Sequence, residues 1–216
     1  MLQIGRSFLL LAATTCFISG IGGVPLATAS VIAFATPLIV ATLSRPLLGE
    51  PVDARQWAAL IAGFLGVLVV FRPGSTPVGF SGLLIFGSAT SYALYQIVSR
   101  RIGAHDAAET GIVYAALIGT LATSLVVPFV WETPRNLLDL ALFAAIGVLG
   151  GIGHYCVTRA FQLAPAAVLS PLGYLELVGA TVVGYLVFGT APDAVTWFGA
   201  AIIIGSGLYI ARRQAR

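Results

Sequence analysis

Long apolar runs separated by short polar breaks make up almost the whole chain. Each run approaches the roughly 20 apolar residues that a helix needs to cross the hydrocarbon core of a bilayer. No connection between the runs exceeds roughly a dozen residues, which leaves no room for a soluble domain. The predicted helices cover residues 6–22, 25–48, 55–71, 80–100, 110–130, 136–159, 165–188 and 194–213. The pattern therefore predicts an all-α polytopic membrane protein with eight transmembrane helices.

One stretch of the sequence occurs twice. Residues 165–213 align without a gap on residues 25–73, a shift of 140 residues (165 minus 25). We interpret this as an internal duplication, in which three helices (domain 1–74) match the last three of five helices (domain 75–216). The coinciding pairs are Pro25 and Pro165, Ser30 and Ser170, Gly49 and Gly189, Asp53 and Asp193, Trp57 and Trp197, Arg72 and Arg212, and, upstream, Cys16 and Cys156.

Composition narrows the class of protein. The 216 residues are 58% hydrophobic and 9% charged, with a mean hydropathy of +0.99, which excludes a soluble domain. The net charge of +3 comes from arginines in loops and at helix ends, so nothing supports nucleic-acid binding. Cys16 and Cys156 lie inside apolar runs, where we expect small packing residues and no disulfide. Residues 6–22 alone also resemble a signal peptide, but the duplication favours a mature transmembrane helix.

The arginines predict the orientation of the chain. Eight helices place both termini on one side of the membrane, and an excess of positive charge marks the cytoplasmic side. The arginines expected on the side of the termini are Arg6, Arg45, Arg55, Arg100, Arg101, Arg159, Arg212, Arg213 and Arg216, against Arg72 and Arg135 on the other. We therefore expect a cell (inner) membrane protein with both termini cytoplasmic. The two copies then cross the membrane in opposite senses, as the repeats of secondary transporters do.

The duplicated stretches also resemble a known family. Residues 25–74 and 163–213 look like the closing parts of two EamA domains, of the drug/metabolite transporter superfamily. Within it, the segments LYQIVSRRIG, VVPFVW and YLE are most similar to the branch with bacterial riboflavin and S-adenosylmethionine importers. The resemblance implies ten helices in two inverted five-helix repeats, cytoplasmic termini and transport of small metabolites. The sequence lacks the first two helices of that pattern, from a misplaced start or a true truncation.

Glu176 is the sharpest candidate for a substrate-binding residue. It falls about midway along the predicted helix 165–188, where a carboxylate costs roughly 2.5–3.5 kcal/mol on insertion scales. Thr36 takes its place in the first copy, so the duplication itself does not require an acid there. One interpretation is a cavity-lining group that binds a cationic part of the substrate or a coupled proton. The other is a hydrogen-bonded carboxyl that fixes helix packing.

Prolines and a glycine predict interruptions in two corresponding helices. Pro171 and Gly173 lie about one turn before Glu176, and Pro37 interrupts the matching helix of the first copy, although not at the aligned position. Broken helices in corresponding positions of two repeats are the best pointer from sequence to a transporter's binding site. A plain kink that improves packing is the alternative.

Further candidates for the substrate site are aromatic or titratable. Tyr92 and Gln96 are four residues apart and share a helix face with Tyr95 close by, and with Tyr174 they would stack on an aromatic substrate. His154 lies among glycines and titrates near neutrality, which suits proton coupling. Interface anchoring or packing is the alternative for the tyrosines and Gln96, and a histidine hydrogen-bonded to a neighbouring helix is the alternative for His154. No spacing of histidines, cysteines or acids indicates a metal or a cofactor.

The leading hypothesis is a secondary transporter of a small metabolite that works by alternating access. Its expected partners are the lipid bilayer and the substrate, with a homodimer left open. A membrane-embedded enzyme is disfavoured because no loop gathers a nucleophile, a base and an orienting group. A transport-inactive truncated paralogue is the third alternative.

The opposite orientation of the two copies is directly testable. A single cysteine beside Asp53 is expected to react with a membrane-impermeant thiol reagent only from the cytoplasmic side, and one beside Asp193 only from outside. Labelling of whole cells against inverted vesicles measures this, with Cys16 and Cys156 replaced. Reaction of both positions from one side contradicts the inverted repeat.

Overall fold

The computed structural model describes the chain except residues 1, 73, 75–78, 104–105, 190–192 and 215–216, so Arg216 lies outside the described residues. All regular structure in the described part is helical. The helices are α1 (Leu2–Ile21), α2 (Leu26–Ala33), α3 (Thr36–Leu48), α4 (Ala54–Phe71), α5 (Gly79–Ile102), α6 (Ala108–Val130), α7 (Leu137–Leu163), α8 (Ala166–Leu169), the 3₁₀ turn η1 (Ser170–Tyr174), α9 (Leu175–Phe188) and α10 (Ala194–Gln214).

Most of these helices have the length and hydropathy of membrane spans. Among the described residues six stretches qualify, Leu2–Ile21, Leu26–Leu48, Ala54–Phe71, Ala108–Val130, Leu137–Leu163 and Ser170–Val187, and a shorter apolar stretch covers Ala194–Tyr209. The chain is therefore a polytopic, all-helical membrane protein. The 24-residue helix α5 is long enough, but it is not among these stretches and carries serine, threonine, tyrosine and glutamine along its length. The count of eight spans stays a prediction.

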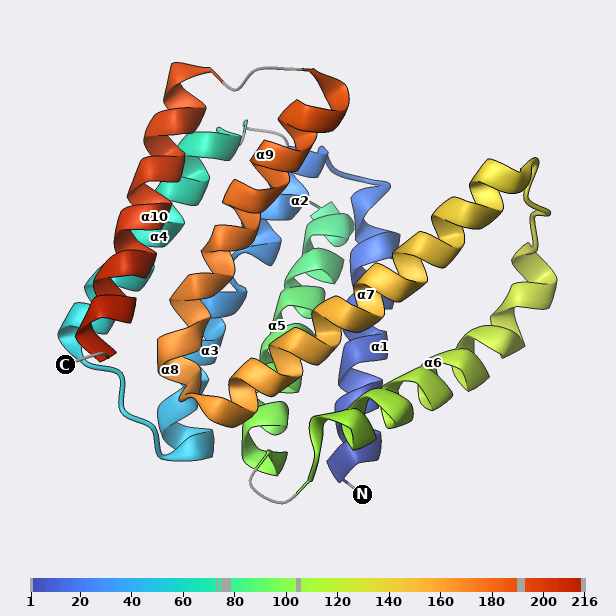
Figure 1. The fold of residues 1–216 in the computed structure, drawn as a ribbon, viewed down its shortest axis with the longest axis horizontal. Helices are drawn as coiled ribbons and strands as arrows, with labels where there is room; N and C mark the ends of the chain where they lie inside the picture. The colour runs from blue at the N-terminus through green and yellow to red at the C-terminus, as the bar shows by residue number, and fades with distance from the viewer. Residues whose placement is uncertain (1, 73, 75–78, 104–105, 190–192, 215–216) are drawn as a thin grey trace.

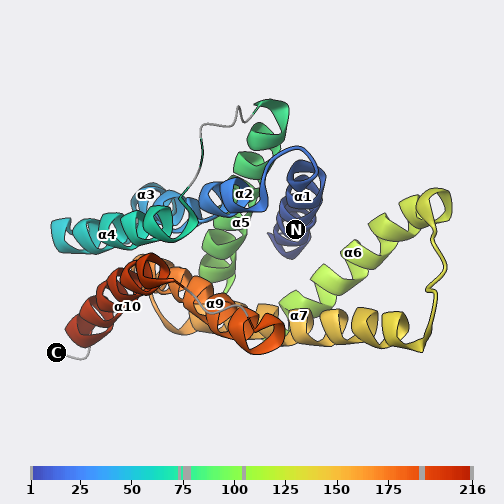
Figure 2. The same ribbon diagram turned by 90° about the horizontal axis from the view of Figure 1, so that it is seen from above.

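Helix α5 lies at the centre of the arrangement (Figures 1 and 2). It packs along its length against α1 and, on another side, against α3. Helices α4 and α10 form a second pair at one end of the molecule. Both chain termini lie toward the same end of the helices in Figure 1. Polar residues on α5 therefore face neighbouring helices and are kept away from lipid.

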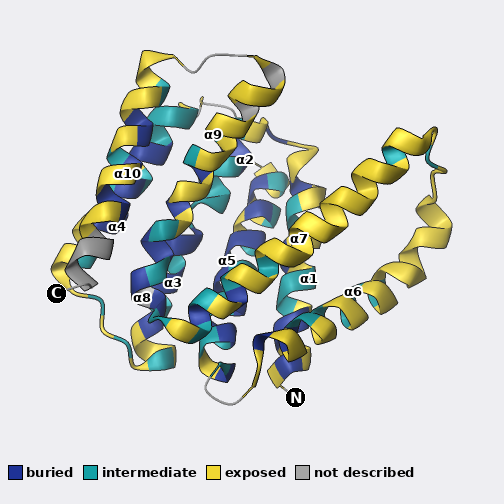
Figure 3. Ribbon diagram, in the orientation of Figure 1, coloured by how far each residue is buried: buried dark blue, intermediate teal, exposed yellow. Residues whose placement is uncertain are grey.

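Helices α6 and α7 diverge from the rest of the molecule. Figure 3 shows them exposed over most of their length. Their buried residues lie only near the end where they meet the other helices: Ala108 and Gly111 on α6, and Thr158 and Phe161 on α7. A Cβ atom built at Gly147 or Gly151 would meet no described atom within 4 Å. The apolar surface of these two helices is thus unpartnered in the described chain.

The helix predicted at residues 25–48 is broken in two, at Phe34 and Ala35 between α2 and α3. The sequence places the interruption at Pro37, but this proline lies in the first turn of α3, where a missing N–H costs little. Proline cannot donate to the carbonyl of Ala33, four residues back. The Thr36 hydroxyl donates to that carbonyl instead, at 2.8 Å. The break therefore falls two to three residues before the proline.

The helix predicted at residues 165–188 is broken as well. The short helix α8 passes into the 3₁₀ turn η1, which contains Pro171 and Gly173, before α9 begins at Leu175. A Cβ at Gly173 would lie 3.6 Å from Cγ of Pro37. Interruptions were predicted in both helices, and in the structure these two segments lie against each other.

An ion pair joins α4 to the start of α10. Arg72 Nη2 lies 2.6 Å from Oδ2 of Asp193, while Oδ1 of this aspartate accepts hydrogen bonds from the backbone and hydroxyl of Thr196. The hydrogen bonds from Thr196 and Arg72 hold the pKa of the Asp193 carboxyl below its usual range. Asp53 caps α4 in the same way, with Gln56 returning the hydrogen bond. The side chain of Arg212, which aligns with Arg72, lies outside the described residues.

Glycines let α4 and α10 approach backbone to backbone. A Cβ at Gly66 would lie 3.0 Å from the carbonyl oxygen of Gly199, and a Cβ at Gly199 would lie 2.9 Å from that of Gly66. Small residues at crossings are typical of helix pairs in membranes, where close packing replaces the hydrophobic effect.

Alanine at these crossings is expected to destabilise the protein. Gly66→Ala and Gly199→Ala force the helices apart, at a cost of about 1–3 kcal/mol. Gly179→Ala on α9 is the matched control, because its Cβ would meet nothing within 4 Å, and the higher helix propensity of alanine favours it. Thermal unfolding in lipid nanodiscs measures the effect, and equal behaviour of Gly66→Ala and Gly179→Ala contradicts the close crossing.

Candidate functional site

Three of the predicted site residues meet in one aromatic group. The rings of Tyr92 and Tyr95 on α5 stack with centroids 5.6 Å apart and planes 13° apart. His154 on α7 meets both rings edge-on, at 6.4 Å and 6.1 Å between centroids. The Tyr95 hydroxyl, which is buried, lies 3.0 Å from Oγ1 of Thr158. Side chains from α5 and α7 thus form one aromatic group.

Arg6 completes this group, although its position in the sequence predicts only a charged residue at a helix end. Its guanidinium carbon lies 5.1 Å from the centre of the Tyr95 ring, and the side chain is 1% exposed. A Cβ at Gly111 on α6 would overlap the guanidinium, so a larger residue at that position would displace the end of the arginine side chain. We name Arg6, Tyr92, Tyr95, His154 and Thr158 the arginine–tyrosine cluster.

The sequence carried a signal for Arg6 that charge counting missed. Gln3, Arg6 and Ser7 are spaced i, i+3 and i+4, so they share one face of α1, and all three are buried. A polar stripe on an otherwise apolar helix indicates an inward-facing polar site, whereas an anchoring arginine stands alone at a helix end.

Glu176 and Gln96 lie beside the cluster. Gln96 follows Tyr92 by one turn of α5, and the Glu176 carboxylate lies within electrostatic reach of the same tyrosine. Glu176 stands in the first turn of α9, directly after the break, where the positive end of a helix dipole favours a carboxylate. Its partner by alignment, Thr36, occupies the first turn of α3. Corresponding positions after the two breaks thus carry polar side chains.

Tyr174, the remaining predicted site residue, has different neighbours. It is fully buried and packs in a cluster with Leu60 and Ile203, with its ring 6.3 Å from that of Phe34. Its hydroxyl has no hydrogen-bond partner within the described part of the chain. Tyr174 thus fills the space between the breaks and the α4–α10 pair, and its predicted contact with substrate stays a prediction.

Glu50 ties several elements together at the arginine-rich end. Its carboxylate accepts a hydrogen bond from Arg100 Nε at 2.8 Å and another from the backbone N–H of Ala166 at 2.7 Å. Arg100 also donates to the carbonyl of Gln162 at 3.1 Å. We name this the Glu50 clamp. It joins the α3–α4 connection to α5, α7 and α8.

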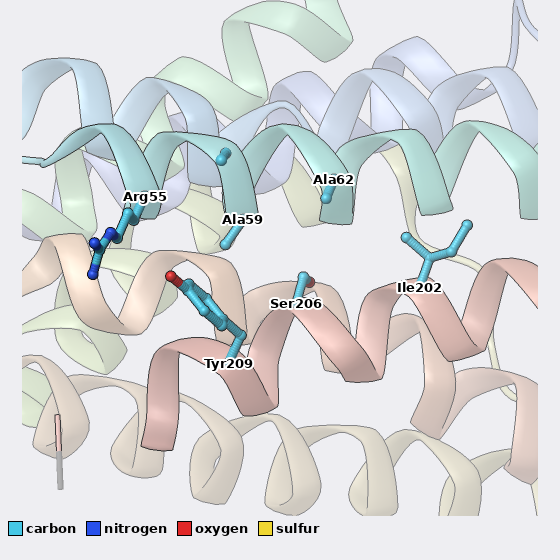
Figure 4. A pocket seen from close by; sticks show the side chains of 7 residues that line it. Arg55, Ala59, Ala62, Ile202, Ser206 and Tyr209 are labelled. Atoms are coloured by element: carbon cyan, nitrogen blue, oxygen red, sulfur yellow. The ribbon is translucent and has the colours of Figure 1, made fainter. Parts of the chain in front are cut away.

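A groove of about 260 Å³ lies elsewhere, between α4 and α10 (Figure 4). Its lining residues are Arg55, Ala58, Ala59, Ala62, Ile202, Ser206 and Tyr209. Figure 4 shows Arg55 and Tyr209 facing across one end and small or aliphatic side chains along the rest. None of the predicted site residues lines it. We place the candidate site at the arginine–tyrosine cluster, because charged, aromatic and hydrogen-bonding groups converge there.

The arrangement is suited to binding. A stacked aromatic pair, a guanidinium, an imidazole and a carboxylate can hold a flat, charged molecule through stacking and hydrogen bonds. Among the residues that the structure describes, no three His, Cys, Asp or Glu side chains gather as metal ligands would.

Known proteins resemble the chain over nearly its whole length. The profile of the EamA-like transporter family matches residues 3–72 and 79–212. An S-adenosylmethionine uptake transporter of Rickettsia prowazekii is 29% identical over 95% of the chain and 69% of its own length. A riboflavin transporter of Rhizobium johnstonii is 30% identical over 93% of the chain and 66% of its own length. A pseudopaline exporter of Pseudomonas aeruginosa is 29% identical over 92% of the chain and 70% of its own length. The chain thus spans about two thirds of these relatives.

A solved crystal structure has the same fold. It superposes with a TM-score of 0.82 at 22% identity, covering 94% of the chain and 75% of that protein. At this identity the likeness concerns the fold alone.

Removing the Glu50 carboxylate is expected to loosen the arginine-rich end. Glu50→Ala leaves Arg100 Nε and the Ala166 N–H without their acceptor, and hydrogen bonds to charged groups contribute about 1.5–3 kcal/mol. Glu132→Ala, in the exposed α6–α7 connection, is the control. The unfolding midpoint in nanodiscs is the measurement, and an unchanged midpoint in Glu50→Ala rules out the clamp as a stabilising contact.

Proposed function

Because the chain belongs to the EamA-like transporter family, we propose that it moves a small metabolite across the cell membrane as a secondary transporter. The observation that carries the proposal is the meeting of two interrupted helices, with Gly173 of one against Pro37 of the other. Broken helices that face each other supply polar backbone groups at membrane depth, which transporters use to bind substrates and ions.

The proposed architecture is a pair of inverted repeats, residues 1–74 and 75–216, with eight membrane spans. Contacts between α4 and α10 support it, because they recur under the 140-residue shift. Gly63 lies against Ser206, and Gly66 lies against Ile203. Under the 140-residue shift Gly63 aligns with Ile203 and Gly66 aligns with Ser206, so the second contact is the first with the two helices exchanged. A two-fold relation between the repeats produces this exchange of partners.

The two-fold relation between the repeats also explains why one face of α7 is exposed. Helix α1, which aligns with α7 through Cys16 and Cys156, packs against α5 and α6. By symmetry, the corresponding face of α7 receives two helices in the complete transporter. The relatives support this, since their sequences extend beyond the part that the chain matches.

The proposed substrate site is the arginine–tyrosine cluster together with Glu176 and Gln96. Tyr92, whose ring is backed by Tyr95, offers a stacking surface, and Glu176 binds a positive group of the substrate or a coupled proton. The names of the relatives, which transport S-adenosylmethionine and riboflavin, support a substrate with a ring system.

Alternating access needs contacts that close each side of the site in turn. The Glu50 clamp lies at the end expected in the cytoplasm, and the Arg72–Asp193 pair lies at the opposite end. Opening toward the cytoplasm would separate Glu50 from Arg100 while the Arg72–Asp193 pair holds. The pathway is therefore proposed to be closed by ion pairs at both ends.

Uptake measurements test the function. In cells that express the protein with any helices its gene encodes upstream, uptake of S-adenosylmethionine or riboflavin is expected to exceed that of empty-vector cells. Glu176→Gln and Tyr92→Ala are expected to lower this uptake at least about tenfold, or about 1.4 kcal/mol, with membrane levels unchanged. Tyr185→Ala, an exposed tyrosine on α9, is the matched control.

The opposite results have separate meanings. Normal uptake in both Glu176→Gln and Tyr92→Ala removes the site assignment and leaves the transporter in place. Absence of uptake for every metabolite in a broad growth-rescue screen favours a transport-inactive paralogue.

A further inference from the structure

Arg6 is a buried charge that forms neither of the ion pairs in the described part of the chain. Those pairs are Arg72–Asp193 and Arg100–Glu50. The Arg6 side chain is 1% exposed, between α1, α5 and α6. Burying a cation without a counterion costs several kcal/mol in a protein interior. The contact with the Tyr95 ring returns about 2 kcal/mol when desolvated, which offsets only part of that cost. Helix packing alone therefore does not account for an arginine at this position.

The unpartnered atoms of Arg6 lie on one edge of the guanidinium. Nε and Nη2 are buried and have no hydrogen-bond acceptor among the described residues. The guanidinium carbon lies 5.1 Å from the centre of the Tyr95 ring, and a Cβ at Gly111 on α6 would overlap Nη1 and Nη2. Nε and Nη2 form the edge that binds the two oxygens of a carboxylate in parallel. The geometry thus leaves free the donors that recognise such a group.

We propose that Arg6 is the anion-binding residue of the transport site, and that the transported metabolite carries a carboxylate next to a flat or cyclic group. This inference rests on the transport function proposed above. The carboxylate binds the Nε–Nη2 edge of Arg6, while the flat group packs on Tyr92 and the imidazole of His154. Glu176, beside Tyr92, receives a positive group where the metabolite has one.

A carboxylate fits the site better than a phosphate. One guanidinium balances the single negative charge of a carboxylate, whereas a phosphate dianion would leave one charge unbalanced in apolar surroundings. The side-on edge also offers two parallel donors, which match two carboxylate oxygens. Because Arg6 is closed off in this conformation, binding requires the arginine-rich ends of α1, α5 and α6 to separate, as alternating access demands.

Two probes that differ only in charge test the anion site. 3-Phenylpropanoate and 3-phenylpropanamide share the ring and the chain length, and only the first carries a carboxylate. Each is added at millimolar concentrations to the purified protein in phosphatidylcholine nanodiscs, which contain no anionic lipid. The dissociation constant is obtained from the shift in the unfolding midpoint. We expect the carboxylate to bind at least about tenfold more tightly than the amide.

Variants assign that difference to Arg6. Arg6→Gln is expected to abolish it, and Arg6→Lys to keep a part, because an ammonium supplies charge without the parallel donors. Arg159→Gln is the matched control, an exposed arginine on α7 that donates to Gln162, and it should keep the full difference. Without ligand, Arg6→Gln is expected to unfold at the same temperature as the parent or higher, since it removes an uncompensated buried charge.

Several results would overturn the proposal. Equal binding of the two probes, binding of neither, or an unchanged difference in Arg6→Gln each excludes an anion site at Arg6. A lower unfolding midpoint in Arg6→Gln with unchanged probe binding assigns Arg6 to helix packing. In each of these cases, uptake that depends on Glu176 would still support the transport function, so the two proposals fail separately.

Discussion

A bilayer core offers no hydrogen-bond partners, and the rest of the structure depends on this constraint. A helix can be interrupted there only where protein surrounds the interruption. The chain places its two interrupted helices against each other, with Phe34 and Ala35 half-buried and Ser170, Pro171 and Tyr174 of the turn η1 buried. The Thr36 hydroxyl donates to the carbonyl of Ala33, to which Pro37 cannot donate because it has no N–H. The polar groups available for a substrate are therefore concentrated where the two helices meet.

The same constraint explains which helices are polar. Helix α5 carries the tyrosines and the glutamine of the candidate site, and it is surrounded by α1 and α3. Helices α6 and α7 present mostly apolar side chains and are exposed along most of their length (Figure 3). Polar contacts that bind the elements together lie near the helix ends, at Glu50 with Arg100 and at Arg72 with Asp193. Ion pairs at the ends and aromatic groups further inside are the distribution that a gated, membrane-embedded binding site needs.

Much of the fold followed from sequence, because long apolar runs have few solutions in lipid. The helix ends agree with the predicted runs within a few residues, and the family resemblance is confirmed by the family profile. The position of the first break is less predictable from sequence. The missing N–H of Pro37 removes only the hydrogen bond to the carbonyl of Ala33, so the helix is interrupted before the proline and not at it. Arg6 was assigned to the helix end because charge counting ignores which face a residue occupies. The contact of Tyr92 and Tyr95 with His154 depends on how α5 packs against α7. Local sequence patterns do not predict that packing.

Water access to the turn η1 tests the central claim, that the two helix breaks border the transport pathway. With Cys16 and Cys156 replaced by serine, a cysteine is placed at Gly173, in the turn, or at Val183, an exposed position near the middle of α9. A small charged methanethiosulfonate reagent then reports which position water reaches. Rapid labelling at position 173, at least about tenfold faster than at 183, is the predicted result, because charged reagents do not enter lipid. Equal or slower labelling at position 173 would mean that lipid or tightly packed protein fills the region, and would contradict a pathway there.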